Sequence, residues 1–131
     1  MNSVELLQTT LTDTLAGKLA FPEVIRILSE AGVQSYRTDM VRREVTYSMT
    51  NGAVHVLPMQ FAGSPVAGPF SGEQVVAAIR ESQAGRLIYP DFLTRVMDAG
   101  TCAYDVDFDG RQAVYYGSGG DSHVERFPGS R

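Results

Sequence analysis

Residues 16–23 read AGKLAFPE, and residues 84–91 read AGRLIYPD. Phe21 in the first stretch matches Tyr89 in the second, which sets a shift of 68 positions because 89 − 21 = 68. Other pairs brought together by the same ungapped shift are Ala31-Gly32 with Ala99-Gly100, Tyr36 with Tyr104, Asp39 with Asp107, Tyr47 with Tyr115, and His55 with His123. Two unrelated halves that shared only turn residues would not match at tyrosine and histidine. The sequence therefore predicts a tandem duplication.

The match defines two repeats within one domain that spans residues 1–131. The first repeat covers residues 3–59 and the second repeat covers residues 71–127, and the glycine- and proline-rich residues 60–70 form a linker. At 131 residues the chain has the length of a single domain. Neither repeat is long enough to bury a separate core, so we expect both to contribute to one.

Each repeat begins with two helix patterns. In the first repeat, leucines at positions 7, 11 and 15 form one apolar stripe, and Gly17 then ends the helix. Pro22 suits the first turn of the next helix, because a missing N–H costs nothing there. Ser71 and Gln74 match a capping box at the start of the second repeat.

Three short strand patterns follow each helix pair. The expected strands are 33–39, 43–49 and 53–59 in the first repeat, and 101–108, 111–117 and 121–127 in the second. Asp109-Gly110 predicts a two-residue hairpin turn. The apolar segment Val54–Leu57 favours a central strand. The predicted fold is α+β, an ααβββ unit repeated to give a six-stranded, mainly antiparallel sheet with four helices on one face.

Composition excludes several classes of function. The net charge is −4 and no basic stripe is present, which argues against nucleic acid and anionic membranes as partners. Cys102 is the only cysteine, so no internal disulfide is possible. We find no signal-peptide pattern and no apolar run long enough to span a membrane, so we expect a cytoplasmic protein.

The sharpest local pattern for chemistry is Asp121-Ser122-His123-Val124-Glu125. Alternate residues of a strand face the same way, so Asp121, His123 and Glu125 would share one face. One imidazole and two carboxylates are able to bind a divalent metal or to perform acid–base catalysis. The alternative, which we favour, is a solvated strand face, and we otherwise expect no cofactor.

The repeated histidines and tyrosines give a second set of candidate binding residues. If the third strands of the two repeats met, His55 and His123 would approach each other, although each histidine is more simply a structural residue of its own repeat. Tyr47 and Tyr115, with the other tyrosines, are candidates to line a small-molecule pocket. Tyrosines also commonly close the edges of a core, which is the role we favour.

The chain also resembles a known family. The stretches that carry the resemblance are Phe21-Pro22-Glu23, Ala31-Gly32-Val33, Tyr36, Asp39 and Gly120–Pro128. They are similar to the YbcV-like family of bacterial and prophage-borne proteins, a domain-of-unknown-function family in which some members are labelled phage envelope protein. The resemblance implies an α+β fold and no established activity, cofactor or catalytic residue.

Three functional hypotheses follow. The first is a non-enzymatic binding or protein-interaction module, expected to be a homodimer because an open sheet leaves edges and one face without a partner. The second is a metal-dependent or acid–base enzyme that uses Asp121, His123 and Glu125 with help from His55. The third is a sensor that holds a small molecule among its tyrosines.

Overall fold

The computed structural model describes residues 2–63 and 65–128. Its helices are α1 (Ser3–Leu15), α2 (Phe21–Glu30), α3 (Gly72–Gln83) and α4 (Tyr89–Asp98). Its strands are β1 (Val33–Asp39), β2 (Glu44–Met49), β3 (Val54–Pro58), β4 (Thr101–Asp107), β5 (Gln112–Gly117) and β6 (Ser122–Arg126). Residue 64 of the predicted linker and residues 1 and 129–131 of the predicted domain lie outside the described residues.

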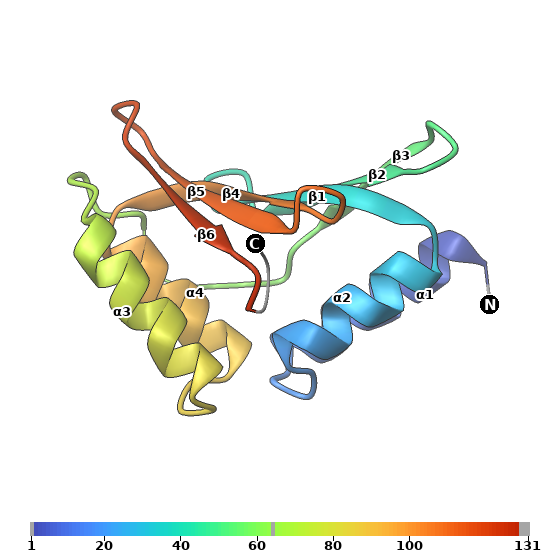
Figure 1. Cartoon of the computed structure of the whole chain (residues 1–131), viewed down its shortest axis with the longest axis horizontal. Helices are drawn as coiled ribbons and strands as arrows, with labels where there is room; N and C mark the ends of the chain where they lie inside the picture. Colours follow the sequence, from blue (N-terminus) through green and yellow to red (C-terminus); the bar gives the residue numbers. More distant parts are fainter. Residues whose placement is uncertain (1, 64, 129–131) are drawn as a thin grey trace.

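The six strands form one antiparallel sheet in the order β3-β2-β1-β4-β5-β6. Figure 1 shows all four helices on one side of this sheet, as two pairs that diverge beneath it. These observations confirm the predicted α+β class. The element order ααβββ occurs twice along the chain, while the duplication that would explain it stays an inference from the sequence.

The sheet is joined at its centre by the first strands of the two repeats, β1 and β4. Arg37 pairs with Asp105 in this register, and the two residues are repeat equivalents because 105 − 37 = 68. The third strands, β3 and β6, are the two edges. The prediction of a central strand at Val54–Leu57 is therefore wrong. The segment is apolar on both faces of the strand, but only Leu57 faces the core, whereas Val54 and Val56 are exposed.

The helices begin and end where the sequence predicts. Gly17 and Gly85 follow α1 and α3 with φ of 77°, a left-handed conformation that glycine adopts without a Cβ clash. Pro22 lies in the first turn of α2, and the Ser71 hydroxyl accepts a hydrogen bond from the Gln74 N–H at 3.3 Å. These signals place both helix pairs against the sheet.

The first hairpin of the second repeat differs from its prediction. Residues 108–111 form a four-residue loop instead of a two-residue Asp-Gly turn. The Asp107 carboxylate accepts the Gly110 N–H at 3.1 Å, and Arg111 takes the left-handed conformation with φ of 52°. Arg43 has φ of 59° at the equivalent position. In both hairpins an aspartate side chain accepts hydrogen bonds from backbone N–H groups of the loop.

No helix within residues 2–63 and 65–128 is long and apolar enough to cross a membrane.

Candidate functional site

A cavity of about 620 Å³ lies between the helix-facing side of the sheet and the two helix pairs. It is within the usual size range of small-molecule sites. Its walls come from both repeats. The aromatic residues that line it are Phe21, Tyr36, Tyr47, Tyr89, Phe92, Tyr104, Tyr115 and Phe127. Because the centre of the sheet forms its floor, the cavity is shared by the two halves of the chain.

Four tyrosines form the floor of the cavity. Tyr36 pairs with Tyr47 between β1 and β2, and Tyr104 pairs with Tyr115 between β4 and β5. The rings of Tyr104 and Tyr115 stack with centroids 5.2 Å apart and planes at 24°. Tyr36 lies edge-on to Tyr104 at 6.3 Å. The repeat places these aromatic pairs side by side because β1 and β4 are neighbours.

The Tyr104 hydroxyl is the centre of a group of four hydroxyls, here called the hydroxyl cluster: Thr38, Tyr36, Tyr89 and Tyr104. The Tyr104 hydroxyl shares a hydrogen bond with the hydroxyl of Tyr89 on α4, and Thr38 is the partner of Tyr104 in the register of β1 and β4. Burial raises the pKa of Tyr104, and the neighbouring hydroxyls of Thr38, Tyr89 and Tyr36 lower it by less. Burial also raises the pKa of Tyr36 and Tyr89 well above the usual value. The cluster is therefore uncharged and consists of neutral donors and acceptors.

The remaining floor tyrosines are uncharged for the same reason. Burial raises the pKa of Tyr47. Burial also raises the pKa of Tyr115, and the nearby Tyr104 and Glu125 raise it further. A floor of neutral phenols favours aromatic and other weakly polar ligands over ions.

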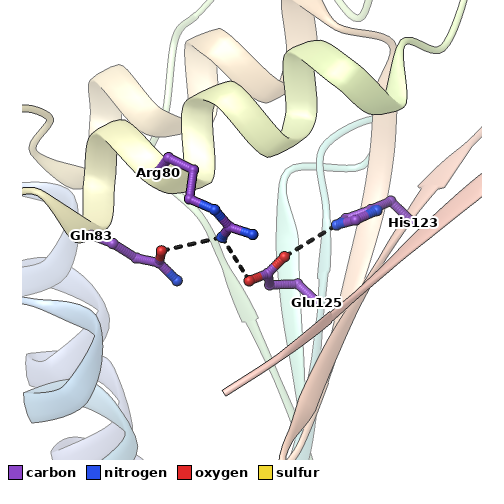
Figure 2. Close-up of polar contacts among 4 residues, drawn as sticks. All are labelled: Arg80, Gln83, His123 and Glu125. Atoms are coloured by element: carbon purple, nitrogen blue, oxygen red, sulfur yellow. Dashed lines mark hydrogen bonds and ion pairs between the residues drawn. The ribbon is translucent and has the colours of Figure 1, made fainter. Parts of the chain in front are cut away.

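A carboxylate network lies beneath α3, as Figure 2 shows, and two of its members, Gln83 and Glu125, line the cavity. Glu125 accepts a hydrogen bond from Arg80 at 2.8 Å and contacts His123 Nε2 at 3.2 Å. Gln83 accepts a second hydrogen bond from the Arg80 guanidinium at 3.2 Å. Burial opposes the charge of Glu125, but the hydrogen bonds from Arg80 and His123 outweigh it and lower its pKa. Glu125 is thus an ionised group whose side chain is only 16% exposed.

Apolar side chains form part of the rim of the cavity. Phe21 and Ile88, which follow the two helix–helix loops, are 40% and 50% exposed. Phe127 lies just after β6 and packs edge-on against Phe21, with ring centroids 5.5 Å apart. The Arg111 guanidinium lies over the Phe127 ring, 5.6 Å from its centre. Phe127 thus covers part of this rim, which also includes the exposed Lys18, Glu23 and Arg126.

The structure places the predicted site residues in different regions. Tyr47 and Tyr115 line the cavity, whereas His123 lies behind Glu125. His55 is on β3 and His123 on β6, at opposite edges of the sheet, so the third strands do not meet and the two histidines do not approach each other. Asp121 precedes β6 and is exposed.

The predicted metal set gains no support from this arrangement. Across residues 2–63 and 65–128, no group of three or more histidine, cysteine or acidic side chains is placed to hold a metal ion. Glu125 instead binds Arg80, a helix residue that the strand pattern alone did not indicate. The predicted solvated strand face is also wrong for β6, because His123 and Glu125 face α3 and are half-buried.

Sequence reasoning missed three residues of the site. Thr38 and Tyr89 line the cavity, and Arg80 binds the lining residue Glu125 from outside it. The signal for Tyr89 was present in the repeat, since it occupies the position of Phe21 and adds only a hydroxyl. Thr38 gave no signal, because its role depends on the register between β1 and β4, in which it pairs with Tyr104.

Comparison with known protein families gives one match. The model of a family described as protein of unknown function (DUF1398) matches residues 13–124, which is most of the chain. The chain belongs to the DUF1398 family. The DUF1398 match includes all four floor tyrosines and Tyr89, and it ends one residue before Glu125. No curated protein sequence matches the chain.

Proposed function

We propose that the protein is a non-enzymatic binding module whose ligand is a small, largely apolar molecule held in the cavity between the repeats. The observation that carries the proposal is the cavity itself, floored by four tyrosines and bordered by a few convergent polar groups. A concave apolar site with a small number of polar anchors is typical of small-molecule binding.

The rim supports the same proposal. Phe21 and Ile88 are large apolar side chains that remain exposed beside the opening. An apolar ligand that entered there would cover part of both side chains, which stabilises the complex by roughly 25 cal/mol for each Å² removed from water.

The opposite face of the sheet is less suited to a protein partner. Its centre holds the ion pair between Arg37 and Asp105, at 3.3 Å, and the Arg37 guanidinium lies over the Tyr116 ring. The exposed valines Val56 and Val124 lie on opposite edge strands and form no central apolar patch. We therefore favour a small molecule over a protein as the main ligand.

Titration by NMR tests this proposal with acetophenone, a neutral aromatic ketone, as the probe. We expect saturable chemical-shift changes at residues that line the cavity. Ala113→Leu fills the cavity from β5 and is expected to weaken binding, because Ala113 is a buried lining residue. Val114→Leu, the next residue on the same strand and facing the opposite side, is the control. Absence of saturable binding, or equal loss in both variants, would contradict the proposal.

Membership of the YbcV-like group within the family, association with prophages, a cytoplasmic location and a homodimeric state remain further proposals. The homodimer rests on the two unpaired edge strands, β3 and β6. Sedimentation equilibrium of the full chain tests it, and a mass equal to one chain at all concentrations would rule it out.

A further inference from the structure

The hydroxyl cluster contains a hydrogen-bonded pair that has one more proton than it uses. Each of the cluster's four hydroxyls carries a single proton, and the hydroxyls of Tyr89 and Tyr104 share one hydrogen bond. Two protons and one hydrogen bond leave one O–H group of this pair without an acceptor inside the pair. Because the cluster borders the cavity, a ligand with an accepting oxygen matches this donor.

Glu125 offers the complementary chemistry. Arg80 contacts its Oε2 atom and His123 contacts its Oε1 atom. A carboxylate has about four acceptor positions, so these two partners leave capacity for a donor on the ligand. The carboxylate is ionised and lines the same cavity, so it would attract a hydroxyl group and repel an anion.

Aromatic side chains in the same half of the cavity indicate which part of a ligand would fit between the hydroxyl cluster and Glu125. Tyr104 and Tyr115 are stacked, and the Phe92 ring of α4 meets Tyr115 edge-on at 6.2 Å. Aromatic rings prefer offset-stacked or edge-to-face neighbours. A planar aromatic ring is therefore the group that these walls complement best.

We infer that the ligand is an uncharged aromatic compound with a carbonyl oxygen at one end and a hydroxyl group at the other. The carbonyl accepts from the hydroxyl cluster, and the hydroxyl donates to Glu125. This inference rests on the proposed function, because it assigns the ligand class of the same cavity.

Four probes of similar size distinguish a test of the inferred ligand class from a test of the proposed function. They are para-hydroxyacetophenone, acetophenone, para-ethylphenol and ethylbenzene, which carry both polar groups, the carbonyl alone, the hydroxyl alone and neither. We expect para-hydroxyacetophenone to bind tightest and each missing group to weaken binding by about five- to tenfold, as measured by NMR titration. Equal affinities for all four would overturn the inference and leave the proposed function standing. Failure of all four to bind would overturn both.

Two variants assign each polar group to its partner. Tyr89→Phe combined with Tyr104→Phe removes both hydroxyls of the hydrogen-bonded pair, and Glu125→Gln removes the negative charge. We expect the double variant to reduce the advantage of probes that carry the carbonyl, and Glu125→Gln to reduce the advantage of probes that carry the hydroxyl. Variants that weaken all probes equally would contradict this assignment. The comparison of probes on the unaltered protein holds even if a variant fails to fold.

Discussion

The two repeats supply different walls to the same cavity. The first repeat has Leu57 and Phe21 where the second has Glu125 and Tyr89. The floor, in contrast, repeats tyrosine for tyrosine, with Tyr36 matching Tyr104 and Tyr47 matching Tyr115. The cavity thus has a shared aromatic floor, to which the second repeat adds the hydroxyl of Tyr89 and the carboxylate of Glu125.

The difference also extends across the centre of the sheet. Thr38 pairs with Tyr104, whereas the equivalent partner of Tyr36 is Val106. Tyr104 therefore has a hydroxyl neighbour on β1 and another on α4, while Tyr36 faces an apolar residue on the neighbouring strand. The two repeats form the cavity together, and the few residues that differ between them make its two sides chemically different.

Alkaline titration should show the largest effect of the buried floor. Five of the six tyrosines line the cavity, and burial raises their pKa values above 10.0 in the folded state. The unfolded chain loses these protons first, so stability is complete below pH 10 and falls as the pH rises. The expected loss is about 1.4 kcal/mol for each cavity tyrosine per pH unit.

Phenolate absorbance measures the ionisation of the tyrosines, and circular dichroism measures unfolding in the same titration. The five cavity tyrosines should ionise only as the protein unfolds, whereas Tyr116, on the other face of the sheet, should ionise apart from that transition. Gradual ionisation of all six without unfolding would show that the floor is open to water.

Removing single hydroxyls tests whether Tyr104 and Tyr36 differ as the structure indicates. Tyr104→Phe leaves the buried Tyr89 hydroxyl without its hydrogen-bond partner and should lower the free energy of unfolding by about 2 kcal/mol. Tyr36→Phe removes one outer member and should cost about 1 kcal/mol. Urea denaturation measures both, and equal costs would mean that the cluster has no centre.

Glycine substitutions compare the helix ends of the two repeats. Gly17 and Gly85 share φ of 77°, so alanine should cost about 1 kcal/mol at either position. A Cβ atom at Gly17 would lie 3.0 Å from Ile88 Cδ1, whereas nothing lies within 4 Å of one at Gly85. We expect Gly17→Ala to cost about 1 kcal/mol more than Gly85→Ala in thermal denaturation. A larger cost at Gly85 would contradict the contact between the loops.

Glu125→Gln gives the smallest expected change and depends on pH. Its folded-state pKa lies below the ordinary 4.5, so the stabilisation is present above pH 4.5 and is lost as the pH falls through the folded value. We expect the variant to be less stable by about 1 kcal/mol at neutral pH, with the difference vanishing in acid. A difference that is independent of pH would show that the Arg80 contact contributes nothing.

Local patterns in the sequence were sufficient for the fold class and the helix ends. Apolar spacing, Gly17 and Pro22 act within a few residues, so their effect is readable without knowledge of the fold. The order of the strands was not readable, because it depends on which strands of the two repeats meet. That gap led to the wrong placement of Val54–Leu57.

The candidate site was predictable only in part for the same reason. Tyr47 and Tyr115 drew attention because they repeat, but their shared cavity required β1 and β4 to be neighbours. Glu125 was visible as part of a strand pattern, yet its partner Arg80 lies on α3, 45 residues earlier in the chain. Contacts between distant segments are set by tertiary packing, which local periodicity does not specify.

The central claim is that the tyrosine floor binds an aromatic ligand. Intermolecular nuclear Overhauser effects between acetophenone and the protein test it most directly. We predict contacts from the probe to the ring protons of Tyr104 and Tyr115 on the floor of the cavity. Contacts confined to the methyl groups of Val56 or Val124, on the opposite face of the sheet, would contradict it.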